Sequence, residues 1–394
     1  MFGELMRKLM KPLRWLAGSL ALTGAGIVML NSNIVASVDA TTLTDASRYQ
    51  DGKFYNVQAF EKPGLLKTLA FAKRYFMEPA IDKVPTQAIP NRTISRFELE
   101  LLPDNDLHFI KLGHSSVLLK VYGEYWLLDP VFSERASPFS FLGPKRFHQP
   151  PISVAQLPPI AKVLISHNHY DHLDKASIKQ LASKTEQFLV PLGVDTDLQK
   201  WGVAKEKITS FDWWQEQTVA NALIAFTPTQ HFSGRGIGDG NTTLWGSWVI
   251  KTAAGSIFFS GDSGYFAGFA QIGAKYGPFD ISFIETGAYD KDWPHIHMTP
   301  EQSVQAHLDV KGSVMVPVHN GTFDLAFHAW YEPLERVSRA AEQQQVKLLT
   351  PEFGAALSMS TLLPQVAANR YWWQDMMQQS AAAANNAVVA TGVE

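Results

Sequence analysis

A short segment rich in metal-binding side chains, residues 166–172, constrains the fold more than any other part of the sequence. It reads Ser-His-Asn-His-Tyr-Asp-His and directly follows the apolar run 161–165, which has the length and composition of a buried strand. At a strand end, His167 and His169 point the same way, and a turn at the next step directs Asp171 and His172 toward a second point. The segment therefore predicts two adjacent pockets, each of which needs further ligands from elsewhere in the chain.

Three other polar residues are candidates for the missing ligands, because each one stands where an apolar, strand-like run ends. They are His231, Asp262 and His319. We expect Asp262 to bridge two ions, so that each ion has four protein ligands. The first ion would also be bound by His167, His169 and His231, and the second by Asp171, His172 and His319.

The composition restricts the kind of metal site. The chain has no cysteine, which excludes disulfides, thiolate metal sites and cysteine nucleophiles, so any metal must be bound by imidazole and carboxylate. Two Zn²⁺ ions are expected first for such ligands, although Mn²⁺ or Fe would accept the same set. The net charge of -3, from 34 basic and 37 acidic residues, gives no electrostatic reason to expect a nucleic-acid partner.

Strand-like runs recur from residue 107 onward, with helical patterns between some of them. Helices are expected at 175–184 and 300–309, and strands at 107–112, 116–121, 125–128, 162–165, 223–226, 245–250, 257–259, 281–284 and 314–318. This order indicates an α/β or α+β domain in which helices cover sheets.

Composition divides the chain into four parts. A catalytic domain at 105–360 is preceded by an extension at 41–104 and followed by a tail at 361–394, whose end we expect to be a frayed helix or disordered. Within the extension, 64–79 predicts an amphipathic helix that either packs on the domain or lies on a membrane surface. The first part, 1–40, is a signal peptide or a membrane anchor.

The reason for that assignment is the order of residues at the N-terminus. Four basic residues between Arg7 and Arg14 precede the apolar run 15–30, as in a secretory signal. The run is slightly short for a transmembrane helix, so a cleaved signal and an uncleaved anchor both remain open. Either one places the catalytic domain across the membrane, which predicts the periplasmic side of the cell envelope.

The pattern His167-x-His169-x-Asp171-His172, followed by His231, Asp262 and His319, resembles the metallo-β-lactamase superfamily. More narrowly, stretches such as 129–138, 143–147 and 319–323 resemble N-acylphosphatidylethanolamine-hydrolysing phospholipase D and its bacterial relatives. The resemblance implies a four-layer αβ/βα sandwich, two metal ions, a phospholipid substrate at a membrane surface and a homodimer. Asn320 departs from it, since the animal enzymes are expected to have an aromatic residue there.

The resemblance also implies a reaction. Hydroxide activated by the two ions would attack phosphorus, releasing N-acylethanolamine and leaving phosphatidic acid. Asp262 would bridge the ions, and Asp171 would also help to move a proton. His297 precedes a helix and resembles a substrate-side histidine of the family; a phosphate contact or proton donor is expected, with a structural role as the alternative. His114 fits a supporting or core role better than a catalytic one.

Two other functions stay open. A lactonase or another phosphodiesterase of the superfamily is the enzymatic alternative, because the same ions polarise a carbonyl group as readily as a phosphoryl group. A metal-binding regulatory protein of the cell envelope is the non-enzymatic alternative, and loss of a ligand would be its usual signature. All seven predicted ligands are present in the sequence, which favours an enzyme.

Overall fold

The computed structural model describes residues 38, 43–44, 47–60, 70, 73–74, 77–78, 82–219 and 221–378. The predicted signal or anchor at 1–40 lies outside these residues except for Val38, and so does most of the predicted helix at 64–79. Among the described residues, no helix is both long enough and apolar enough to cross a membrane.

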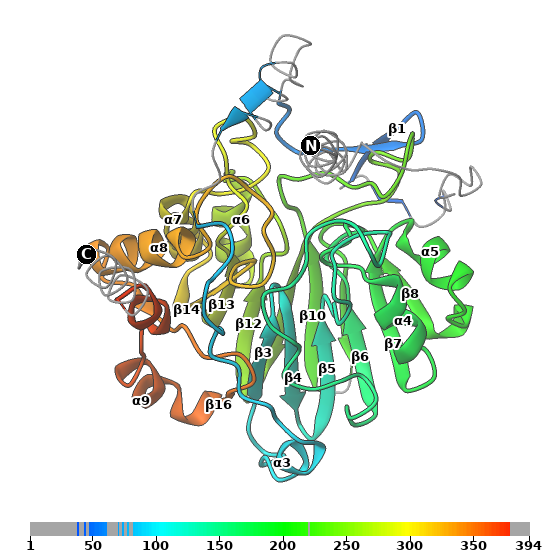
Figure 1. Ribbon diagram of the computed structural model, residues 1–394. Helices are drawn as coiled ribbons and strands as arrows, with labels where there is room; N and C mark the ends of the chain where they lie inside the picture. Colours follow the sequence, from blue (N-terminus) through cyan, green and yellow to red (C-terminus); the bar gives the residue numbers. More distant parts are fainter. Residues whose placement is uncertain are drawn as a thin grey trace, which may run out of the picture.

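Two seven-stranded sheets form the centre of the molecule (Figure 1). The first sheet has the order β16 (Ala356–Ser358), β3 (His108–Gly113), β4 (Ser116–Val121), β5 (Glu124–Leu128), β6 (Ile160–Leu164), β7 (Thr185–Pro191) and β8 (Ile208–Phe211). The second has the order β15 (Lys347–Leu348), β14 (Gly312–Val318), β13 (Phe279–Glu285), β12 (Gly255–Phe259), β11 (Ser247–Thr252), β10 (Ala222–Thr227) and β9 (Glu216–Val219).

Helices cover the outer face of each sheet. On the first sheet they are α4 (Lys175–Leu181) and α5 (Val194–Lys200), and on the second α6 (Gly268–Lys275), α7 (Pro300–Asp309) and α8 (Glu332–Gln343). One apolar core lies between the two sheets. A second core lies between the first sheet and its helices, and a third lies between the second sheet and its helices. The predicted four-layer αβ/βα sandwich is therefore confirmed.

The remaining elements are short. Among the described residues they include β1 (Arg48–Gln50), β2 (Lys53–Tyr55), α3 (Arg96–Glu100), α9 (Leu362–Ala367) and the 3₁₀ turns at Lys205–Lys207 and Met359–Thr361. The β1–β2 hairpin belongs to the N-terminal extension, and its Phe54 is fully buried in the core between the sheets. The described part of the extension thus packs on the catalytic domain.

The strand directions bring the predicted ligand positions to one edge. β12, β13 and β14 are parallel, and β10 has the same direction as β12 because each is antiparallel to β11. The loops that follow β10, β12 and β14 therefore leave the second sheet at the same edge. The loop after β6 leaves the first sheet beside them, as the distances below establish.

Part of the C-terminal tail is helical and packs on the domain. Residues 372–378 are helical, and Trp372 and Trp373 are buried against Trp330 and Phe353. Two large aromatic side chains remove enough apolar surface from water to hold a short helix in place. The alanine-rich and asparagine-rich residues beyond them, 379–394, lie outside the described residues.

Candidate metal centre

Buried hydrogen bonds fix the start of the histidine-rich loop. β6 ends at Leu164, and the Ser166 backbone N–H donates to Oδ1 of Asp129 at 2.7 Å. The Ser166 hydroxyl donates to the other oxygen of the same carboxylate. Asp129 follows β5, the neighbour of β6, so one buried carboxylate ties the two strand ends together. The turn that follows then directs its side chains toward the loops after β10 and β12, where His169 meets His231 and His172 meets Asp262.

Four ligand atoms form a first cluster. His167 Nε2 lies 2.8 Å from His169 Nδ1, and His231 Nε2 lies 3.2 Å from that same Nδ1. Oδ2 of Asp262 is 3.7 Å from Nε2 of both His167 and His231. All four atoms are within 4.8 Å of one another, which suits a single ion bound by three imidazoles and a carboxylate.

A second cluster lies beside the first and shares Asp262. Oδ2 of Asp171 is 3.5 Å from His172 Nε2 and 3.2 Å from His319 Nε2. Asp262 approaches the same two histidines, with Oδ1 3.1 Å from His172 Nε2 and Oδ2 3.1 Å from His319 Nε2. The structure thus brings together all seven predicted ligands, and it places Asp262 between the two groups.

His114 stands closer to this second cluster than a core role requires. Its Nε2 lies 3.0 Å from Oδ2 of Asp171, and it groups with Asp171, His172 and His319 as a further donor. The residue lies in the tight turn between β3 and β4 with a positive φ of 51°, which directs its ring toward His319. The sequence favours a supporting or core role for His114, and a contact with a predicted ligand suits the first of these two.

The ring nitrogens that face away from the clusters have partners of their own. His172 Nδ1 lies 2.8 Å from Oδ2 of Asp129, His167 Nδ1 lies 2.9 Å from the Ser166 hydroxyl, and His231 Nδ1 lies 2.8 Å from the Ile296 carbonyl oxygen. Metal-binding histidines typically have such second partners, which fix the tautomer and the ring orientation.

The donor atoms fit a divalent cation. His172 Nε2 and Asp262 Oδ1 are buried and have no hydrogen-bond partner, although they lie 3.1 Å apart. Burial lowers the pKa of His172, but the carboxylates of Asp262 and Asp171 outweigh it and raise that pKa well above its usual value. Two buried carboxylates thus require positive charge here, and metal ions would supply it.

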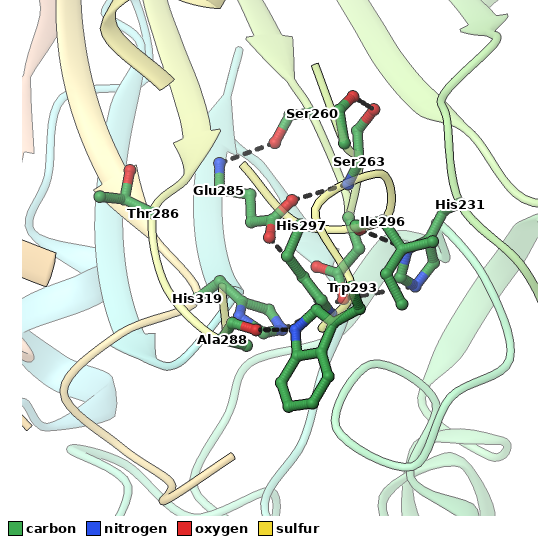
Figure 2. A network of polar contacts seen from close by, with 12 residues as sticks. His231, Ser260, Ser263, Glu285, Thr286, Ala288, Trp293, Ile296, His297 and His319 are labelled. Carbon is green, nitrogen blue, oxygen red and sulfur yellow. Dashed lines mark hydrogen bonds and ion pairs between the residues drawn. The ribbon is translucent and has the colours of Figure 1, made fainter. Parts of the chain in front are cut away.

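A third carboxylate, Glu285, meets His297 at the border of the site (Figure 2). The two side chains form a very short hydrogen bond through His297 Nδ1, and the other Glu285 oxygen accepts the Ser263 backbone N–H at 2.6 Å. The His297 ring centroid is 5.1 Å from that of His231 and 5.2 Å from that of His319. His297 therefore faces both clusters.

Burial determines the charge of this pair. It raises the pKa of Glu285 well above its usual value, and the nearby Asp262 carboxylate raises it further. Burial also lowers the pKa of His297 to about 4. Both shifts favour the uncharged forms, a protonated Glu285 carboxyl and a neutral His297 imidazole. The sequence analysis identified His297 but missed Glu285.

Comparisons with known proteins agree with this geometry. Residues 125–320 match the beta-lactamase superfamily domain. The chain is 30% identical over 321 residues to the N-acyl-phosphatidylethanolamine-hydrolyzing phospholipase D 1 of Caenorhabditis elegans, and the alignment covers 76% of this chain and 90% of the worm protein. The protein therefore belongs to the metallo-β-lactamase superfamily, as its sequence predicts.

Two further proteins are similar to parts of the chain. An uncharacterized protein of Mycobacterium tuberculosis is 47% identical over 243 residues, which span 61% of this chain and 65% of the mycobacterial one. The isothiocyanate hydrolase from Delia radicum gut bacteria has a similar solved structure, with a TM-score of 0.51 and 18% identity, covering 64% of this chain and 99% of that one. At this identity, the second likeness concerns the fold alone.

Proposed function

We propose that the protein is a two-metal hydrolase that cleaves N-acylphosphatidylethanolamine to N-acylethanolamine and phosphatidic acid, as a phospholipase D does. The observation that carries this proposal is the position of Asp262, whose carboxylate lies between the two clusters. Asp262 would be a ligand of both ions, and a pair of ions would suit a phosphodiester, which develops negative charge on several oxygens as it reacts. The similarity to the worm phospholipase supports the choice of substrate.

The chain's own residues would hold two ions in this centre. His167, His169 and His231 would bind one ion, and Asp171, His172 and His319 would bind the other. Asp262 would bind both, since it lies close to histidines of each group. When bound, two such ions make water acidic enough to give hydroxide near neutral pH and neutralise charge on a phosphoryl oxygen. We propose Zn²⁺ for both positions, since imidazole and carboxylate are ligands that zinc accepts. Asp171 also contacts His114, which gives it a neighbour for proton exchange.

We propose that His297 acts on the substrate rather than as a metal ligand. Its Nδ1 is engaged by Glu285, so Nε2 is the nitrogen left for a substrate above the two clusters. If Nε2 donated its proton to the departing head-group oxygen, Nδ1 would take the Glu285 proton, so the ring would stay neutral and Glu285 would become a carboxylate. Glu285 thus acts through His297 as a positioning residue.

A lipid substrate suits the cellular location that we propose. The basic and apolar N-terminal residues would direct the catalytic domain to the periplasmic side of the cell envelope, either anchored or released by cleavage. There the domain would meet phospholipid at the membrane surface. Fractionation of cells that express the full chain, beside a chain lacking residues 1–40, would test this location.

The test of the activity is direct. The purified, zinc-loaded protein is incubated with N-acylphosphatidylethanolamine in detergent, and products are identified by mass spectrometry beside an Asp262→Ala control. Metal-dependent release of both N-acylethanolamine and phosphatidic acid by the wild-type chain alone is the expected result. Absence of release by a protein that binds two zinc ions would refute the substrate, and turnover of acyl-homoserine lactones would then identify a lactonase.

A further inference from the structure

Asn56, a residue of the N-terminal extension, holds the backbone of the predicted ligand His231. Its side-chain Nδ2 donates to the His231 carbonyl oxygen at 2.7 Å, and the His231 N–H donates to its Oδ1 at 3.0 Å. The same Oδ1 also accepts from Trp245 Nε1 at 3.2 Å. Asn56 is buried, and it contacts His231 although the two residues are 175 positions apart in the sequence. One amide group therefore satisfies both backbone groups of a residue that faces the first cluster.

The neighbours of Asn56 extend this contact along the rim of the site. Gln230 Nε2 donates to the Gln58 carbonyl oxygen at 2.7 Å, and the Phe60 ring stacks on His295 with centroids 5.8 Å apart. Residues 56–60 thus touch the loop that carries His231 and the loop that leads to His297. Figure 1 shows the blue N-terminal segment at the same end of the molecule as these green and yellow loops.

Only an amide side chain suits this position. The loop residues 228–231 follow the end of β10, so their backbone groups need partners outside the sheet. The Gln230 N–H donates to the Ser263 hydroxyl and the Gln230 carbonyl oxygen accepts from the Gly264 N–H. Both backbone groups of His231 bond the Asn56 amide instead. An ionised aspartate accepts but cannot donate, and an alanine does neither. Either replacement leaves a backbone group of His231 without its partner in a buried place.

We propose that Asn56 is a positioning residue of the metal centre, and that residues 56–60 form part of the wall of the site. The inference rests on the proposed metal-binding role of His231. The segment lies outside residues 125–320, which match the superfamily domain. Its function is to fix the backbone of His231 so that Nε2 meets His169 and Asp262 without rearrangement.

The experiment measures zinc binding, not activity, in the full-length chain. Asn56→Ala is compared with Asn369→Ala, since Asn369 also accepts from a backbone N–H, that of Thr350 at 2.9 Å, but lies after α9 away from the site. Zinc affinity is measured by competition with a chelator, and the melting temperature of the metal-free protein is recorded for each variant. We expect Asn56→Ala to weaken one of two zinc-binding steps by about tenfold to a hundredfold.

The expected result for Asn369→Ala is a lower melting temperature with unchanged zinc affinity. Asn56→Asp keeps the acceptor and serves as the second variant if Asn56→Ala does not fold; its affinity should fall between those of the wild type and Asn56→Ala. Zinc affinity within twofold of the wild type in both Asn56 variants would overturn the inference, as would an equal loss in Asn369→Ala. A wild-type chain that binds no zinc would overturn the metal centre itself and this inference with it.

Discussion

Asp129 contacts His172, a predicted metal ligand, with Oδ2 of the carboxylate 2.8 Å from Nδ1 of the ring. Neither residue has any exposed surface. The same carboxylate accepts the backbone N–H of Ser166, so it fixes both the start of the histidine-rich loop and the ring at its end. The loop therefore keeps its ligands in place through one residue that itself faces away from the clusters.

Replacement of Asp129 should weaken metal binding. In Asp129→Asn, an amide replaces the carboxylate that orients His172, and we expect about a tenfold to hundredfold lower zinc affinity. The matched control is Asp280→Asn, because Asp280 accepts the backbone N–H and the hydroxyl of Ser256 in the same way but has no histidine partner. Chelator competition measures both variants. Equal affinities in Asp129→Asn and the wild type would contradict the role of Asp129.

Loss of the His297 ring should lower turnover without loss of metal. His297→Ala removes a side chain that faces both clusters but whose Nδ1 is bound to Glu285. If the ring donates a proton to the leaving group, kcat should fall by about a hundredfold or more. Zinc content is measured in the same preparation. A variant that has lost zinc would show instead that His297 supports the metal centre.

Replacement of Glu285, the hydrogen-bond partner of His297, should lower turnover less than loss of the His297 ring. Glu285→Gln keeps the size of the side chain and a hydrogen bond to His297, but it removes the group that shares the proton. We expect kcat to fall by about tenfold, with KM and zinc content unchanged, and the pH dependence of kcat to shift. Tyr265→Phe is the control, since the Tyr265 hydroxyl bonds Asp309 at the surface. An unaltered pH profile in Glu285→Gln would remove Glu285 from the mechanism.

The seven predicted ligands could be found from the sequence because four of them lie in one segment that follows an apolar run, and the other three stand close to the ends of such runs. The ends of parallel strands meet at one edge of a sheet, so Asp262 after β12 and His319 after β14 become neighbours through topology. The same rule applies to Glu285, the last residue of β13. It was missed because the sequence does not reveal that β13 lies between β12 and β14, the strands that precede Asp262 and His319.

Other contacts in the structure have no recognisable pattern in the local sequence. Asn56 lies in a segment of mixed composition, and its contact with His231 depends on how the extension folds over the domain. The same holds for Trp372 and Trp373, whose burial depends on Trp330 and Phe353 rather than on a periodic pattern. Such contacts arise only in the folded chain, since no feature of the local sequence encodes the distant partner.

Asn320 has a charged partner at the position where the animal enzymes are expected to be aromatic. Lys111 Nζ donates to its Oδ1 at 2.9 Å and to the Pro317 carbonyl oxygen at 2.8 Å. Lys111 is 3% exposed, and burial lowers its pKa from 10.5 to about 7. The buried ammonium therefore carries a cost in stability, which the two acceptors beside His319 partly offset.

The lowered pKa of Lys111 predicts how the free energy of unfolding depends on pH. Between pH 7 and 10.5 the unfolded chain keeps the Lys111 proton while the folded chain loses it, so the free energy of unfolding should rise with pH. One pKa unit corresponds to about 1.4 kcal/mol, so the contribution of Lys111 between pH 7 and 9 is on the order of 2 kcal/mol. Urea unfolding of zinc-loaded wild-type protein and Lys111→Met at pH 7, 8 and 9 measures it. The difference in stability between the two proteins should grow in favour of the wild type as the pH rises, because the variant has no proton to lose at this position. Parallel pH profiles would mean that Lys111 stays charged in the folded protein, held by Asn320 and the Pro317 carbonyl beside the metal centre.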